Sequence, residues 1–178
     1  NRNVAKLTSQ ELRHAKYSGV FISTAENLAE WTFNRLPNNF PQIASRSKSQ
    51  MKDVELIAQI LLRLENEPKS YNTDELDIEF GSRDDEWDNN VVISEKYKDI
   101  INIIKTILDS DDTNIIVRSR MRNQADFYSL VGALHLLIED NTIPSINEIK
   151  ERLITFVNYE LTNESPQEIK DYYEYSRV

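Results

Sequence analysis

Apolar residues recur every three or four positions along much of this chain, and this spacing constrains the fold more than any other feature. In one segment, about 50–66, they form a broad stripe made of Met51, Val54, Ile57, Ala58, Leu61, Leu62 and Leu64. Positions three and four apart lie on one face of an α-helix, so the stripe predicts an amphipathic helix. The same spacing recurs over about 94–108 and 124–139, which are expected to be helices too.

Short motifs predict where several helices begin. A serine or threonine followed three residues later by glutamate forms a capping box, in which each side chain satisfies a backbone amide of the other residue. The pattern occurs at Thr8–Glu11, Ser23–Glu26, Ser145–Glu148 and Ser165–Glu168. Thr73 is expected to cap a further short helix. Gly19 is expected to end the first helix in a left-handed conformation.

The chain has few residues that interrupt helices, with 3 glycines and 5 prolines among 178 residues. So few breakers disfavour a turn-rich sandwich or barrel. We therefore predict an all-α fold: one irregular domain of about seven helices over residues 1–178. The segments 37–49 and 81–90 are expected to be loops, and residues 114–117 are either a short strand or a buried turn.

No catalytic machinery can be assigned from the residue types. Cysteine is absent, which excludes disulfides and thiolate metal sites, and two histidines are too few for a zinc cluster. The glycines are too far apart to form a phosphate-binding loop. We therefore expect no catalytic residue, metal or cofactor in this chain, and a self-contained enzyme is disfavoured. No apolar run reaches the ~20 residues that span a bilayer, so we expect no membrane partner and a cytoplasmic protein.

The net charge of −9 is concentrated in one part of the chain. Residues 74–112 contain 13 acidic and 4 basic side chains, and the remainder is balanced. Overall acidity argues against indiscriminate DNA binding but does not exclude a local basic face. Four acids between Asp84 and Asp88 suggest weak calcium binding, but their spacing departs from a calcium-loop pattern and favours a solvated loop.

Three alternating arginines, Arg118, Arg120 and Arg122, precede the predicted helix at 124–139. Arginine side chains suit phosphate, and helix N-termini favour anions, so this cluster is a candidate nucleic-acid contact. The alternative is that the three arginines form ion pairs with the acidic segment 74–112. Tyrosines at the end of the chain, Tyr172, Tyr173 and Tyr175, are able to stack on bases, although packing of the last helix is the more ordinary role.

The opening sequence NRNVAKLTSQELRHA carries a specific pattern. It resembles the stretch RLN-x-x-x-x-KL-x-x-QElRnA of the GmrSD-type modification-dependent restriction systems, with Asn1 on the asparagine of RLN and Gln10, Glu11 and Arg13 on the QElR core. Residues 17–19 match the YsG that often follows, and residues 51–56 look like a later family segment, rMkDvEl. Asn3 departs from the pattern, because relatives often have glycine there.

In that family the stretch follows an N-terminal ParB/sulfiredoxin-like domain that bears a DGQQR motif, and it leads into a helical region. The DGQQR motif is absent here, so the family's nucleotide-dependent nuclease activity is not carried onto these residues. The resemblance, together with a start that lacks an initiator methionine, implies a piece of a longer protein whose N-terminal domain is its partner. Glu11 has a capping role, whereas Gln10 and Arg13 are expected to face that missing domain.

Two classes of function follow from these features. In the first, the chain is a non-catalytic helical accessory region of a longer nucleic-acid-processing, defence-like protein, and it contacts DNA as part of that longer protein. In the second, it is a protein–protein interaction module with no nucleic-acid role. Arginines on an open face favour the first class, and arginines paired with carboxylates favour the second.

Overall fold

The chain is all-α, as predicted. A computed structural model describes residues 7–66 and 71–176, of which 70% are helical, and no strand occurs among them. The helices are α1 (Ser9–Lys16), α2 (Val20–Arg35), α3 (Ser45–Lys48), α4 (Lys52–Glu65), α5 (Thr73–Ser82), α6 (Asn90–Asp109), α7 (Ile115–Arg118), α8 (Gln124–Glu139), α9 (Ile146–Val157) and α10 (Gln167–Tyr175), with a 3-10 turn η1 (Arg120–Arg122). Within the described ranges, no helix has the length and apolar character needed to cross a membrane.

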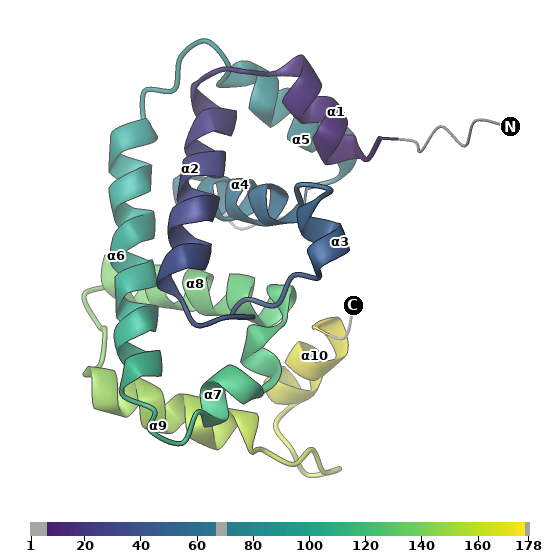
Figure 1. Cartoon of the computed structure of the whole chain (residues 1–178). Coiled ribbons are helices and arrows are strands. Elements are labelled where there is room, and N and C mark those ends of the chain that lie inside the picture. The colour runs from purple at the N-terminus through teal and green to yellow at the C-terminus, as the bar shows by residue number, and fades with distance from the viewer. Residues whose placement is uncertain (1–6, 67–70, 177–178) are drawn as a thin grey trace, which may run out of the picture.

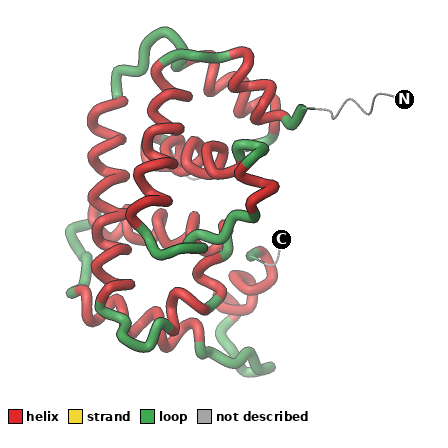
Figure 2. Tube along the Cα trace, viewed as in Figure 1, coloured by secondary structure: helices red, strands yellow, loops and turns green. Residues whose placement is uncertain are grey.

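The long helices cross one another around a single core. Helices α2 and α6 run side by side, and α4 and α8 cross behind them (Figure 1). Helices α1 and α5 lie at one end of the molecule, while α7, α9 and α10 lie at the other. Loops connect these helices throughout the described chain (Figure 2). Ten α-helices occur in the described ranges, and eight of them have seven or more residues, close to the number of about seven expected from the sequence.

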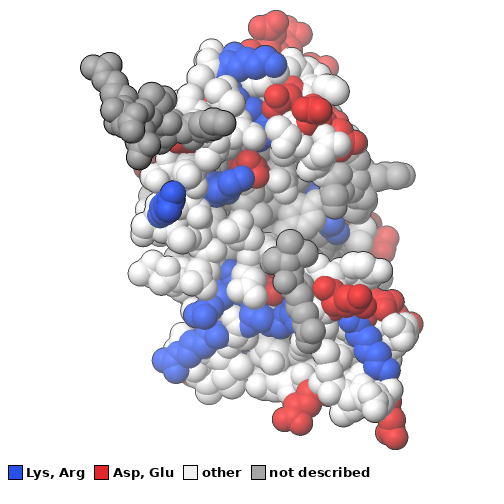
Figure 3. All heavy atoms as spheres, turned by 90° about the vertical axis from the view of Figure 1, so that its right-hand side faces the viewer, with Lys and Arg blue, Asp and Glu red and all other residues white. Residues whose placement is uncertain are grey.

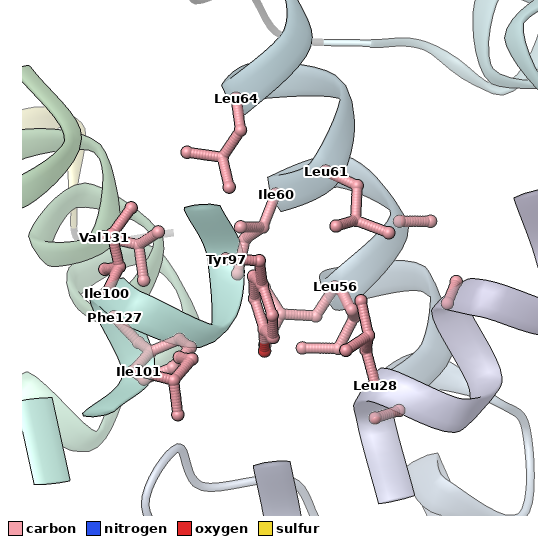
Figure 4. Packing of buried hydrophobic residues seen from close by; sticks show 14 of the residues in the cluster. Leu28, Leu56, Ile60, Leu61, Leu64, Tyr97, Ile100, Ile101, Phe127 and Val131 are labelled. Atoms are coloured by element: carbon pink, nitrogen blue, oxygen red, sulfur yellow. The ribbon is translucent and has the colours of Figure 1, made fainter. Parts of the chain in front are cut away.

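Helix α4 lies at the centre because apolar residues cover most of its circumference. Its buried residues are Val54, Leu56, Ile57, Ala58, Ile60, Leu61, Leu62 and Leu64. This stripe is broader than one face, so the helix packs against α2, α6 and α8 together. Figure 4 shows Leu56, Ile60 and Leu61 of α4 around Tyr97 of α6, with Leu28 of α2 nearby.

Tyr97 brings a polar group into this core. Its side chain is fully buried, and its hydroxyl lies 2.7 Å from Oγ1 of Thr32 on α2, which is also fully buried. Burial raises the pKa of the Tyr97 phenol above its ordinary value, so the group stays neutral. The hydrogen bond satisfies both hydroxyls and fixes α2 against α6.

Two of the four predicted capping boxes are confirmed. Thr8–Glu11 opens α1 and Ser145–Glu148 opens α9, each with both reciprocal hydrogen bonds. A third box occurs where Thr73 had been expected to cap. The cap there is Asn72, whose side chain accepts from the Glu75 amide while the Glu75 carboxylate accepts from the Asn72 amide.

The other two predicted boxes are wrong. Helix α2 begins at Val20, so Ser23 lies inside it and cannot cap it. At α10 the cap position is Pro166 and makes no side-chain hydrogen bond. Ser165 is buried instead, where its Oγ accepts from the Thr162 amide at 2.8 Å. In both places the four-residue pattern is present, but the hydroxyl is not at the helix boundary.

Gly19 does not end α1 in a left-handed conformation. Its φ is −86° and it is the N-cap of α2, while α1 already ends at Lys16. What requires glycine is the close approach of Asp84, because a Cβ here would lie 1.7 Å from the Asp84 carbonyl oxygen. The Gly19 amide donates to Asp84 Oδ1 at 2.7 Å, and the Val20 amide donates to the Asp84 carbonyl at 2.9 Å.

Several predicted boundaries shift for identifiable reasons. Helix α4 starts at Lys52 because Met51 has a φ of 59°, a left-handed conformation that cannot continue a helix. The ambiguous residues 114–117 form α7 and its N-cap, neither a strand nor a simple turn. The expected loop at 37–49 contains α3, and the loop after α5 begins at Arg83 because α5 extends past Gly81. Helix α6 starts at Asn90, earlier than Ser94.

The two leucines in the middle of the predicted stripes are core residues. Leu61 of α4 is 0% exposed and Leu134 of α8 is 1% exposed. We expect Leu61→Ala and Leu134→Ala each to reduce the free energy of unfolding by about 2–5 kcal/mol, because each leaves a cavity. Denaturant unfolding measures this loss. Leu136→Ala is the control, since Leu136 is 51% exposed, and an equal loss there would contradict the assignment of the α8 faces.

Gly19→Ala is expected to destabilise the protein by roughly 1–3 kcal/mol or more, because the added methyl group displaces the Asp84 backbone and breaks the start of α2. Thermal unfolding compares this variant with Gly81→Ala, where the nearest atom to a Cβ is Tyr17 Oη at 3.3 Å. The Gly81 variant should be the milder of the two. Equal melting temperatures for Gly19→Ala and the parent protein would show that the α2 start tolerates a side chain.

Candidate nucleic-acid interface

Two residues of the opening motif, Gln10 and Arg13, make contacts inside the domain. Arg13 is 2% exposed, and its Nε donates to Asp77 Oδ1 of α5 at 2.6 Å. One of its terminal nitrogens reaches Glu55 of α4 at 3.3 Å and Gln10 at 3.1 Å. The Arg13 guanidinium therefore ties α1 to both α4 and α5.

The expectation that Gln10 and Arg13 face another domain is therefore wrong for their side chains. Gln10 is fully buried. Glu11 has the capping role predicted for it. Asn1 lies outside the described residues. The described part of the motif therefore docks α1 onto its own domain.

The three arginines of the cluster have different surroundings. Arg118 and Arg122 are exposed, and neither forms an ion pair with any carboxylate in the described ranges. Arg120 is only 18% exposed at its side chain and pairs with Asp126 of α8 at 2.9 Å. The alternative of pairing with the acidic segment 74–112 is thus not what the described residues show. Two of the three arginines remain available on the surface.

Asp126 organises the end of the molecule where α10 docks. Its carboxylate is fully buried and accepts from Arg120 Nε at 3.0 Å and from the Tyr172 hydroxyl at 2.7 Å. The Arg120 guanidinium also donates to the Ser176 hydroxyl and lies over the Tyr173 ring, 4.2 Å from its centroid. Burial and the neighbouring Asp126 charge raise the pKa of the Tyr172 phenol. Arg120 and Asp126 therefore hold α10 against α8.

A second basic segment, which the sequence reading did not single out, lies beside the arginine cluster. Residues 36–52 contain Arg46, Lys48 and Lys52 and no acid, and residues 113–125 contain the three arginines and no acid. The Gln42 amide donates to the Arg122 carbonyl at 2.6 Å, which joins the two segments. We call the exposed side chains of Arg46, Lys48, Arg118 and Arg122 the basic surface.

Two adjoining hollows lie next to the basic surface. The smaller, of about 640 Å³, is bounded by both acid-free segments and by the start of α8. The larger, of about 760 Å³, extends from there between α4, α8 and α10. They share Ser47, Gln124 and Ala125. We call the larger hollow the tyrosine groove, because it is lined by Tyr71, Tyr128, Tyr172 and Tyr175.

Figure 3 shows the side of the molecule that carries α1, α3 and α10. Lys and Arg gather in the lower left of this view, with few acidic side chains among them, whereas Asp and Glu dominate its top and right edges. Basic and acidic side chains are thus separated on this face of the molecule, as their uneven distribution along the sequence suggests.

The remaining candidate residues have structural roles. Asp84, in the acidic loop, accepts from Gly19, and no group of acids or histidines in the described ranges is arranged to hold a metal ion. His14 pairs with Glu26 at 2.6 Å. Tyr172 and Tyr173 pack against Phe156 of α9, as expected for the last helix, but Tyr175 is 78% exposed.

Comparison of the chain with family models, with curated proteins and with solved structures finds no match. The resemblance of the opening residues to the GmrSD-type systems therefore stays a hypothesis. A function has to be inferred from the charges, hollows and contacts of the chain itself.

Asp126→Asn is expected to loosen α10 without unfolding the domain. The variant keeps the shape of the side chain but removes the charge that Arg120 and Tyr172 contact, at a cost of about 1–3 kcal/mol. Hydrogen exchange of the α10 amides should be faster in the variant than in the unmodified protein, whereas exchange in α4 should stay the same. Asp109→Asn is the control, because Asp109 is 57% exposed in its pair with Lys105. Unchanged exchange in α10 would show that other contacts hold the helix.

Proposed function

We propose that this chain is a non-catalytic helical region of a larger nucleic-acid-processing protein and that it contacts the phosphate backbone of nucleic acid. The observation that carries this proposal is the exposure of Arg118 and Arg122 beside an acid-free segment, with no described carboxylate paired to either. Exposed arginines without partners are typical of phosphate contacts. The resemblance of the opening residues to a restriction family suggests the same role.

The location of the basic surface adds to this proposal. It borders the N-terminus of α8, a helix of 16 residues whose cap residue, Asn123, makes no side-chain cap hydrogen bond. The positive end of a helix dipole favours an anion there, and the Asp126 carboxylate in the first turn is already paired with Arg120. Residues 74–112, which are strongly acidic, would repel phosphate and confine a nucleic acid to the basic surface.

The role of each arginine determines how the proposal is tested. Arg120 forms an ion pair with Asp126, so replacing all three arginines would also disturb the docking of α10. Only Arg118 and Arg122 can be replaced without loss of an internal ion pair among the described residues. The informative variant is therefore Arg118→Gln with Arg122→Gln, leaving Arg120 in place.

We expect the purified protein to bind a labelled oligonucleotide at low salt, and the double variant to bind it more weakly. Each phosphate contact contributes a slope of about −0.9 for a duplex, or about −0.7 for a single strand, to the dependence of log affinity on log salt, so the slope of the variant should be shallower by about 1.4–1.8. Anisotropy titrations at several salt concentrations measure this slope. Circular dichroism confirms that the variant stays folded.

The control replaces two exposed cations outside the basic surface, Lys98→Gln in α6 with Arg152→Gln in α9, which changes the net charge by the same amount. Neither Lys98 nor Arg152 forms an ion pair among the described residues, so this control, like the arginine variant, removes no internal pair. Equal weakening by both pairs would mean that net charge alone governs binding. Absence of binding by the parent protein at low salt would reject the nucleic-acid role and favour a protein-interaction module.

A further inference from the structure

The tyrosine groove has the size and lining of a ligand site. Its volume of about 760 Å³ falls within the range of ligand-binding pockets, roughly 300–1,000 Å³. Polar side chains that carry both hydrogen-bond donors and acceptors, Gln59, Gln124 and Ser129, line it together with the four tyrosines. Such a lining suits a flat, apolar-faced ligand with polar edges.

Two of the tyrosines are held in place by contacts that leave them in the wall of the groove. Tyr172 is fixed by its hydrogen bond to the buried carboxylate of Asp126 and by edge contact with Phe156 at 5.3 Å. Tyr128 has the Arg63 guanidinium over its ring, 4.9 Å from the centroid. A wall that is fixed before binding loses little conformational entropy when a ligand enters.

Tyr175 differs from these two because its side chain is 78% exposed. It lies in the last turn of α10 and lines the groove from the solvent side. An exposed aromatic ring beside a hollow leaves a face on which a planar group can stack.

The charges around the groove also suit an anionic chain. Among the described residues of its lining, Glu55 is the acidic one, and its carboxylate is neutralised by Arg13 at 3.3 Å and by Lys52 at 2.9 Å. The groove adjoins the smaller hollow, which is lined by the start of α8 and by Gln42, whose amide donates to the Arg122 carbonyl. A ligand that lies along both hollows would place negative groups on the basic surface and planar groups among the tyrosines.

We propose that the tyrosine groove binds unpaired bases of a single-stranded nucleic acid whose phosphates lie on the basic surface. In a duplex the faces of the bases are stacked on one another and cannot reach tyrosines that line a hollow. A single strand offers phosphates and free base faces together, and aromatic side chains stack on any base. This inference rests on the proposed function and adds to it the kind of nucleic acid that is bound.

The experiment compares three probes on the full chain: a labelled thymidine oligonucleotide of about 12 nucleotides, within the usual site size for single-strand binding; the same strand in a duplex; and an abasic strand of the same length. We expect the parent protein to bind the thymidine strand more tightly than either of the others. Tyr175→Leu should weaken binding of the thymidine strand about tenfold, the range of one lost base stack. It should leave binding of the abasic strand unchanged.

Tyr175→Phe is the matched control, because it keeps the ring and removes only the hydroxyl. It should bind the thymidine strand like the parent protein, and a loss as large as that of Tyr175→Leu would overturn stacking. Equal binding of all three probes by the parent protein, with loss only in the Arg118→Gln and Arg122→Gln variant, would overturn this inference and leave the proposed function standing. Failure to bind any of the three would overturn both.

Discussion

The burial of α4 is the constraint on which the rest of the structure depends. Its apolar residues pack against α2, α6 and α8 along most of its length, and its partly buried charged residues pair with side chains of neighbouring segments. Near the start of α4, Glu55 forms an ion pair with Arg13 of α1. At the end of α4, the Glu65 carboxylate accepts hydrogen bonds from Arg83 at 2.7 Å, from the Trp87 indole at 2.8 Å and from Asn89 at 2.9 Å.

These two carboxylates explain how the outer segments are attached. Burial by itself raises the pKa of Glu65, but hydrogen bonds from Trp87, Asn89 and Arg83 outweigh it and hold the pKa below its ordinary value. The charged form is therefore the one that stabilises the fold, and its contribution is lost as the pH falls through the folded-state pKa. The loop between α5 and α6 is fixed by this carboxylate and by the contact of Asp84 with Gly19.

The sequence predicts those parts of the fold that depend on local periodicity. The stripes of α4 and α8 identify their buried faces because apolar spacing follows the helical repeat. The capping residue of α2 could not be predicted in the same way. Gly19 is needed because of Asp84, a residue 65 positions away, and the local pattern around Ser23 suggested a later start.

The candidate site, too, could be predicted only where it depends on local sequence and not where it depends on contacts between distant residues. The spacing of Arg118, Arg120 and Arg122 marks a basic segment, but it does not show that one of the three is committed to Asp126. The neighbouring segment 36–52 carries only scattered cations, and its importance depends on its contact with Arg122. Charge along a chain therefore predicts that a basic surface exists, while packing decides which cations are available to a ligand.

Asp126 connects the two parts of the candidate site. One buried carboxylate orients Arg120, which lies between the two exposed arginines, and also Tyr172, which lines the tyrosine groove. Because these contacts hold α10 in place, Asp126 also sets the position of Tyr175 in the last turn of that helix. The basic surface and the groove are therefore parts of one arrangement, set by the docking of α10 against α8.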